Sequence, residues 1–343
     1  MRRCRAADVA DVLAFLHTFW KPGHIFTVQR SLFDWQYASR DHPGEYSMAI
    51  ARRNADDALL GLLGYLPTRH FDPSLAADTT VWLALWKVRD DIAPAGLGLQ
   101  LVKYVADTEP HTSIGVIGFN PAVRPLYQAL GFSVGELQHY VLRNPDMNHV
   151  RLATFQHRPL GMIVDRGITA VPADVEHFSE LVAGLDLADR DAQAPRKTPA
   201  YFLARYLQHP IYRYLCFVVR RAGRPIGLLA MRMATHLGRH ALRVVDYIGP
   251  ADAVDGLGLP VLRQVQALGA EYADVYNWGI EPELFEQAGF SRVDPDGPDV
   301  VPDHFEPFEP RNVRILFALK TRQPAVLFKG DSDQDRPNQL GMS

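Results

Sequence analysis

Two Gly-Leu-Gly tripeptides are the part of this sequence best suited to binding a phosphate group. They are Gly96-Leu97-Gly98 and Gly256-Leu257-Gly258, and each lies between an apolar, strand-like run and a helix-like run. The first turn of a helix has unpaired backbone N–H groups and a dipole that favours an anion. Glycine at this turn removes the side chain that would block a ligand. The sequence therefore predicts a phosphate-binding turn, written twice.

Only the first tripeptide is followed by polar groups that could take part in chemistry. Asn120 and Tyr127 precede a Gly-Phe pair at 131–132, whereas their counterparts before the later Gly-Phe pair are Trp278 and Phe285. A phenol can donate a proton, and a phenylalanine cannot. A single Gly-x-Gly is more often an ordinary turn, and the polar set favours a binding role for the first one. We therefore expect chemistry in the first half of the chain and a silent second half.

The elements that must position these residues recur along the chain. The two tripeptides lie 160 residues apart, and the two Gly-Phe pairs lie 158 residues apart. Ala7-Asp8 and His42-Pro43 recur in the same order as Ala173-Asp174 and His209-Pro210. Four ordered landmarks favour an internal duplication over two ordinary α/β domains that share turn residues.

Hydrophobic periodicity predicts an α/β fold of two tandem domains. Each is expected to be a mixed, mostly antiparallel sheet flanked by helices. The predicted domains span residues 1–160 and 161–328, followed by a disordered polar tail over 329–343. The predicted elements around the signatures are strands over 80–88, 113–117, 134–142, 149–155 and 313–319, and helices over 96–107 and 122–130.

The composition of the chain restricts the class of protein. With 343 residues, it exceeds the usual size of a single core. Its net charge of −3 shows no basic surplus for nucleic acid, and no apolar stretch approaches the roughly 18 residues of a membrane span. The two cysteines, Cys4 and Cys216, are too few for a disulfide framework or a zinc cluster. We therefore expect a cytoplasmic protein without a metal.

The two signatures of the first half resemble the GCN5-related N-acetyltransferase family. Val88 and the glycines at 96 and 98 fall on the family's acyl-CoA motif, and the segment 120–132 matches its second motif. The resemblance covers nearly the whole chain as a tandem. The segment 33–37, followed by His42-Pro43, is similar to a subgroup associated with bacterial surface-polysaccharide genes.

The sequence departs from the family at the start of the phosphate turn. The family's Arg or Gln is Ala93 here and the next residue is Pro94, while the corresponding position in the second half is Ala253. The main phosphate ligands in this motif are backbone amides, which these changes leave in place.

The resemblance implies an acetyl-CoA site in the first half. Tyr127 would lie beside the thioester sulfur and protonate the leaving thiolate. Strand backbone groups at Trp86, Lys87 and Val88 would hydrogen-bond the pantetheine amides. The other cofactor-binding residues that it implies are Ala93, Pro94, Ala95, Gly96, Leu97, Gly98, Leu99, Asn120 and Arg124.

The acceptor side is predicted from residues that precede the acyl-CoA motif. His24 is the candidate general base because histidine titrates near neutrality, and an exposed loop histidine is the alternative. Trp35 could stack on a sugar or nucleotide ring, although core packing is the more frequent role of such a residue. Asp246 and Tyr247, on the equivalent strand of the second half, are further candidate contacts of the substrate.

These inferences predict an N-acetyltransferase that moves an acetyl group from acetyl-CoA to a small-molecule primary amine. The subgroup resemblance implies a nucleotide-linked amino sugar as the acceptor, attacking directly in a ternary complex. Two alternatives stay open. One is an aminoacyl transferase that acts on cell-wall precursors with charged tRNA, and the other is a non-catalytic module that binds CoA or a nucleotide sugar. The sequence leaves the oligomeric state open.

Overall fold

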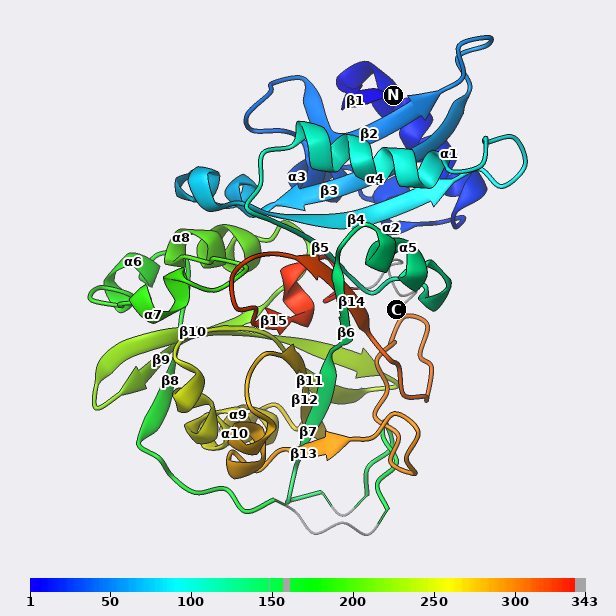
Figure 1. Ribbon diagram of the computed structural model, residues 1–343. Helices are drawn as coiled ribbons and strands as arrows, with labels where there is room; N and C mark the ends of the chain where they lie inside the picture. Colours follow the sequence, from blue (N-terminus) through cyan, green and yellow to red (C-terminus); the bar gives the residue numbers. More distant parts are fainter. Residues whose placement is uncertain (148, 157–160, 337–343) are drawn as a thin grey trace. The chain divides into compact units, whose positions relative to one another are not determined.

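The chain divides into two compact units, which the computed structural model describes over residues 1–147, 149–156 and 161–336 (Figure 1). Unit 1 consists of Met1–Gly135, Leu316–Arg322 and a segment that starts at Ser332. Unit 2 consists of Glu136–Ile315 and Gln323–Asp331. Each unit therefore contains residues from both halves of the sequence.

Unit 1 is built on a seven-stranded mixed sheet in the order β1-β2-β3-β4-β5-β14-β6. β4 and β5 are parallel, while β1–β2, β2–β3, β3–β4 and β5–β14 are antiparallel. The strands are β1 (Arg2–Arg5), β2 (Glu45–Arg52), β3 (Leu59–Pro67), β4 (Thr80–Val88), β5 (Ser113–Ile117), β6 (Ser133–Glu136) and β14 (Leu316–Lys320). The helices are α1 (Val9–Phe19), α2 (Ile25–Val28), α3 (Arg30–Tyr37), α4 (Leu97–Thr108) and α5 (Arg124–Ala129).

Alternation along β3 sends neighbouring residues to the two faces of this sheet. Leu63 and Tyr65 belong to a buried cluster with Leu101 and Val105 of α4. Gly64, between them, faces the ring of Tyr37 on α3, since a Cβ at Gly64 would lie 2.8 Å from Tyr37 Cε1. Helices α4 and α3 therefore cover opposite faces of the sheet.

Unit 2 contains an eight-stranded sheet, in the order β13-β7-β12-β11-β10-β9-β8 with β15 paired to β12. Its one parallel pair among the described strands is β11–β12. The strands are β7 (Gln138–Arg143), β8 (Ile168–Pro172), β9 (Leu215–Arg221), β10 (Arg224–His236), β11 (Arg239–Ile248), β12 (Tyr272–Trp278), β13 (Ser291–Val293) and β15 (Leu327–Phe328). The helices are α6 (Phe178–Leu181), α7 (Ala188–Asp191), α8 (Pro199–Phe202), α9 (Gly258–Ala267) and α10 (Pro282–Gln287).

One strand of each sheet, next to the strand at one edge, comes from the other half of the sequence: β14 in unit 1 and β7 in unit 2. The strand predicted over 134–142 is broken at Leu137, so that β6 joins the first sheet and β7 joins the second. The strand predicted over 313–319 is β14, which lies in the sheet of unit 1. The bounds of the two units therefore differ from the predicted ranges 1–160 and 161–328. The chain passes from the sheet of unit 1 to the sheet of unit 2 at residue 136, and it returns to unit 1 for β14.

Two smaller expectations are wrong. The segment 149–155 forms no named strand, and Thr154 makes only an isolated bridge to Val300. Residues 329–336 of the predicted tail are ordered, because η7 (Lys329–Asp331) and Arg336 are buried. The rest of that tail, 337–343, lies outside the described residues.

The predicted fold class of two mixed sheets flanked by helices is confirmed. No helix of the described ranges is long and apolar enough to cross a membrane. Across the same ranges, the structure places no group of three or more His, Cys, Asp or Glu side chains where they could hold a metal ion.

Candidate functional site

The parallel strands of unit 1 separate after a short common stretch. The β4–β5 ladder covers three pairs, from Thr80↔Ser113 to Trp82↔Gly115, and β4 then continues to Val88. On its other side β4 stays paired with β3, with a bulge opposite Gly64. The distal half of β4 therefore turns a strand edge toward a gap in the sheet. Such an edge can bind an extended, amide-containing chain, as the sequence predicted for Trp86 to Val88.

The turn beyond this gap has an accessible glycine at the start of α4. Gly96 has φ +80° and ψ 0°, a left-handed conformation that favours glycine, and nothing lies within 4 Å of a Cβ added to it. The Leu97 N–H donates to the Pro94 carbonyl at 3.2 Å. The N–H groups of Gly98 and Leu99 are therefore the first-turn donors that helix geometry leaves for an anion.

Gly98 has a packing role that the sequence did not reveal. A Cβ at this position would lie 2.7 Å from Cζ2 of Trp86, so the indole rests directly on the first turn of α4. We expected the two glycines to clear space for a ligand, and in this structure only Gly96 is open. Gly98 instead allows β4 and α4 to approach each other through Trp86.

Tyr127 is buried next to this turn, with 1% of its surface exposed. Its ring centroid lies 6.2 Å from that of Trp86, 5.0 Å from that of Phe119 and 5.3 Å from that of Phe132. Burial raises the pKa of the phenol well above its ordinary value. The hydroxyl therefore stays protonated at neutral pH and could act as a proton donor.

The other predicted cofactor residues belong to β4, to the turn and first residues of α4, or to the segment that begins at Asn120. The exposed Asn120 caps the short helix η4 (Pro121–Val123), where its Oδ1 accepts a hydrogen bond from the Ala122 N–H at 3.0 Å. Lys87 forms an ion pair with Asp90 at 2.8 Å. Ala93 is half-buried, and the exposed residues are Pro94, Ala95 and Arg124.

His24 does not have the properties expected of a general base. It is 1% exposed and caps α2, because its Nδ1 accepts a hydrogen bond from the Phe26 N–H at 3.3 Å. Burial, followed by the charge of Arg336, lowers the pKa of His24 to about 4. A side chain with this pKa is a weak base at neutral pH. The loop is packed rather than exposed, which the sequence pattern could not show.

We predict that His24→Asn leaves kcat within about threefold of wild type, whereas loss of a general base typically costs about 10²–10⁴-fold. Asparagine keeps the helix cap, because its side-chain oxygen can accept the same backbone hydrogen bond. Steady-state rates across the pH range test this. A loss of a hundredfold or more, in a variant with unchanged thermal unfolding, would restore His24 as the base.

The other predicted substrate contacts have structural partners. Trp35 packs on Phe71 at 5.3 Å between ring centroids. Asp246 is fully buried in unit 2, where its carboxylate pairs with Lys197 at 2.6 Å. The buried Tyr247 donates a hydrogen bond from its hydroxyl to the Pro250 carbonyl at 3.0 Å. Neither Asp246 nor Tyr247 is presented to a ligand in this structure.

The equivalent gap in unit 2 is filled by the chain itself. The β11–β12 ladder also covers three pairs, from Leu242↔Ala273 to Val244↔Val275. Beyond it, β15 pairs with β12 through Asn277↔Phe328 and Trp278↔Leu327. We call Leu327–Asp331 the plug. It lies between the separated ends of β11 and β12, where an extended ligand would have to lie.

The plug is fixed at several points. The Asn277 side chain donates a hydrogen bond to the Leu327 carbonyl at 2.9 Å. Gly330 packs on β11, since a Cβ there would lie 2.6 Å from the Val245 carbonyl oxygen. Asp331 forms a buried ion pair with Lys197 at 2.5 Å. Removing one partner of such a buried pair would be costly, so the plug belongs to the folded unit.

The second Gly-Leu-Gly is also closed. A Cβ at Gly256 would lie 2.4 Å from Cγ1 of Ile168, and one at Gly258 would lie 1.7 Å from the Ala288 carbonyl oxygen. These glycines serve close packing around α9. The sequence showed the loss of polar groups in this half, but it gave no sign that the phosphate turn itself is covered.

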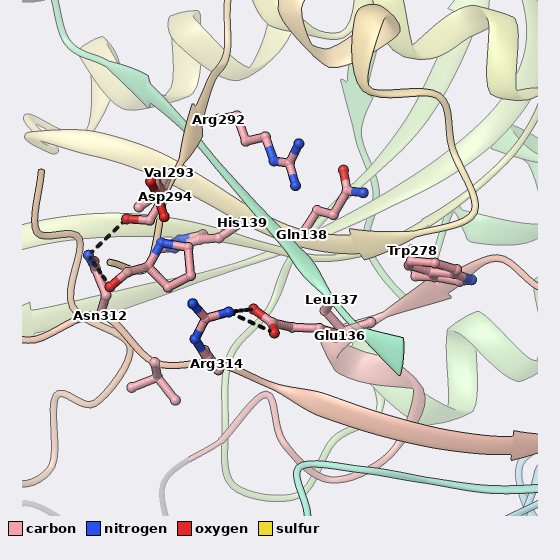
Figure 2. A pocket seen from close by; sticks show the side chains of 12 residues that line it. Glu136, Leu137, Gln138, His139, Trp278, Arg292, Val293, Asp294, Asn312 and Arg314 are labelled. Atoms are coloured by element: carbon pink, nitrogen blue, oxygen red, sulfur yellow. Dashed lines mark hydrogen bonds and ion pairs between the residues drawn. The ribbon is translucent and has the colours of Figure 1, made fainter. Parts of the chain in front are cut away.

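Unit 2 contains a cavity of about 320 Å³ that no pattern in the sequence indicates (Figure 2). Arg314 and Glu136 pair on its wall at 3.0 Å. His139 also lines it, stacked on Tyr276 with 3.9 Å between ring centroids, and its Nε2 lies 3.1 Å from the Asp274 carboxylate. These residues belong to three segments that are far apart in the sequence, so no motif in the sequence includes them together.

The fold is that of solved GCN5-related N-acetyltransferases. One from Anabaena variabilis aligns over 93% of this chain and 71% of its own, with a TM-score of 0.57 and 11% identity. A protein of unknown function from Enterococcus faecalis, described as a probable N-acyltransferase, aligns over 93% and 72%, with a TM-score of 0.55 and 9% identity. A GCN5-related N-acetyltransferase from Kribbella flavida aligns over 93% and 70%, with a TM-score of 0.50 and 11% identity.

These identities establish the fold and nothing finer. No protein-family model and no curated protein matches the sequence. A fold alone does not establish an activity, so the residues of unit 1 must carry any functional assignment.

Proposed function

We propose that this protein transfers an acetyl group from acetyl-CoA to a primary amine, with the cofactor bound by unit 1. One observation carries the proposal. The gap beside β4, the open turn at Gly96 and the buried phenol of Tyr127 all adjoin Trp86 or the residues next to it. Trp86 lies on the part of β4 beyond its ladder with β5, packs on Gly98 in the first turn of α4, and has its ring near that of Tyr127. A diphosphate at the turn, a pantetheine along β4 and a thioester near Tyr127 would use all three.

The residues of unit 1 would contribute binding, orientation and one proton. Backbone N–H groups of Gly98 and Leu99 would hold the diphosphate, and the edge of β4 would align the pantetheine. The amine nitrogen would attack the thioester carbonyl, the C–S bond would break, and the Tyr127 hydroxyl would supply a proton to the leaving thiolate. The proton that the amine nitrogen loses would return to the Tyr127 phenolate, directly or through water, so that the enzyme is regenerated. Holding amine and thioester together supplies much of the rate through proximity.

The chemistry of the cysteines supports direct attack without a covalent enzyme intermediate. Cys4 and Cys216 are both buried. Burial raises the pKa of each thiol to about 12. Since the thiolate is the nucleophilic form, neither side chain is suited to accept the acetyl group.

We propose that unit 2 binds no CoA. The plug fills its strand gap, its glycine turn is covered, and Phe285 replaces the proton-donating tyrosine. Under this proposal unit 2 has a structural role in a protein with one cofactor site. The acceptor that we propose is a nucleotide-linked amino sugar in the cytoplasm, on the strength of the subgroup resemblance alone.

Two measurements test the function. Titration of the whole chain with acetyl-CoA, followed by native mass spectrometry, is expected to show one bound cofactor per chain. Incubation with acetyl-CoA and a panel of amines that includes amino-sugar nucleotides is expected to add one acetyl group to a panel member.

Each alternative gives a different result. Binding of acetyl-CoA without turnover of any amine would favour a binding module. A salt-sensitive complex with charged tRNA, in the absence of CoA binding, would favour the aminoacyl transferase. Two CoA molecules per chain would contradict the silent role of unit 2.

A further inference from the structure

The last described residues of the chain carry a buried arginine in unit 1. We call Ser332–Arg336 the strap. Arg336 is 6% exposed, and its guanidinium carbon lies 4.8 Å from the centroid of the Phe26 ring. Its Nη2 donates to the Gln36 Oε1 at 2.5 Å and lies 3.3 Å from the Asp333 carboxylate. These contacts hold the guanidinium in one place.

One nitrogen of this guanidinium is left without a partner. Nη1 of Arg336 is buried, and it makes no hydrogen bond within the described part of the chain. An arginine stays charged at all physiological pH values and can only donate. A buried donor without an acceptor is rare and calls for a bound molecule or ion that supplies one. The acceptor that a guanidinium binds best is an oxyanion.

The strap and the proposed cofactor residues lie on opposite sides of the gap in the sheet. Gln334 touches the end of β5, since a Cβ at Gly118 would lie 2.5 Å from its Oε1. Tyr37, whose ring lies 5.5 Å from that of Phe26, packs on Gly64 opposite the β4 bulge. This is the face that α3 covers, while α4 covers the other face. A thioester that enters the gap from the α4 side would meet an amine held on the strap side.

We propose that Arg336 recognises an oxyanion, either a carboxylate or a phosphoryl group, on the amine acceptor. The inference rests on the proposed function, from which it takes the position of the cofactor. It adds that the amine acceptor must carry a negative charge, a property that the fold alone does not indicate. Arg336 is a specificity residue in this role, with no part in the proton transfers.

The test uses two pairs of amines that differ by one anionic group. β-Alanine and ethylamine test a carboxylate, and phosphoethanolamine and ethanolamine test a phosphoryl group. Calorimetry on the CoA-loaded chain is expected to show at least about tenfold tighter binding of the anionic member in one pair, a typical effect for a hydrogen bond to a charged group. Arg336→Gln is expected to abolish this preference and leave the affinity for the neutral member unchanged.

Two further variants separate recognition from folding. Gln334→Ala, an uncharged change in the same strap, is expected to keep the preference. Arg336→Lys keeps the positive charge but loses the planar guanidinium with its paired N–H donors, so a several-fold weaker preference for the anionic amine is expected. If Arg336→Gln does not fold, Arg336→Lys is the variant to compare with wild type. Equal binding of both members of each pair by wild type, or an unchanged preference in both Arg336 variants, would overturn the proposal. Failure of the chain to bind CoA would instead overturn the proposed function. The same titrations without CoA would still show whether Arg336 binds the anionic group of the amine.

Discussion

Replacing Tyr127 by phenylalanine is expected to lower kcat by at least about tenfold while acetyl-CoA binds with unchanged affinity. The substitution removes only the hydroxyl. The ring keeps its contacts with Trp86, Phe119 and Phe132, so the surroundings of the proposed cofactor site stay unchanged. Burial raises the pKa of this phenol, and the hydroxyl is therefore a donor throughout the neutral range. Without it, the thiolate would have to leave unprotonated or take its proton from water.

Steady-state kinetics with saturating amine measure this effect, and calorimetry measures the affinity for acetyl-CoA. Tyr104→Phe is a matched control, because it removes a tyrosine hydroxyl from α4 in the same unit. The control is expected to keep wild-type kcat. An unchanged kcat in Tyr127→Phe would remove this residue from the mechanism and leave it a role in packing only.

Local features of unit 1 could be predicted because short-range patterns determine them. The expected strands over 80–88 and 113–117 coincide with β4 and β5, and the helix expected over 96–107 is α4 at Leu97–Thr108. A continuous apolar run forms the strand, and the left-handed turn at Gly96 needs a glycine. The spacing between these elements already implied the order strand, turn, helix and strand.

The exchange of strands could not be predicted, because it depends on pairing between distant segments. β6 and β7 lie in the one strand predicted over 134–142, and nothing in that segment shows that its two parts belong to different sheets. The ladder that receives β14 forms between residues about two hundred positions apart, such as Phe317↔Ile117. Periodicity identifies a strand but does not choose its partner.

The environment of single polar residues was the least predictable part of the site. His24 has the sequence context of a loop histidine, yet it is buried, with the rings of Trp20 and Phe26 next to it. Arg336 stood in a polar stretch whose composition is typical of disorder, and its contact with Gln36 spans most of the chain. Burial of a charged side chain arises from long-range packing, which leaves no local pattern in the sequence.

The silent role that we propose for unit 2 rests on separate observations from the sequence and from the structure. The sequence predicted it from Phe285 and Trp278, which lack the polar groups of Tyr127 and Asn120. The structure adds a physical block, because the plug pairs with β12 in the gap. Restoring a tyrosine at 285 alone would therefore leave the gap closed to an extended ligand.

The largest expected effect on cofactor binding comes from a negative charge at Gly96. Gly96→Asp and Gly96→Asn are nearly the same size, both tolerate a left-handed φ, and both are good residues at the N-terminus of a helix. A side chain here has open space, so neither is expected to disturb the packing of α4. They differ in one charge, placed beside the proposed diphosphate. At an effective dielectric constant of about 20, repulsion over a few ångströms amounts to several kcal/mol before screening by salt.

Gly96→Asp is therefore expected to bind acetyl-CoA at least about tenfold more weakly than Gly96→Asn, with similar thermal unfolding of the two variants. The difference should shrink as the ionic strength rises, because salt screens an exposed charge. Calorimetric titrations at low and high salt measure both effects. Wild-type affinity in both variants would mean that no diphosphate binds at this turn, and the acyl-CoA site would have to be sought elsewhere in unit 1. A loss in Gly96→Asn as large as that in Gly96→Asp would instead show that bulk, rather than charge, controls access to the first turn of α4.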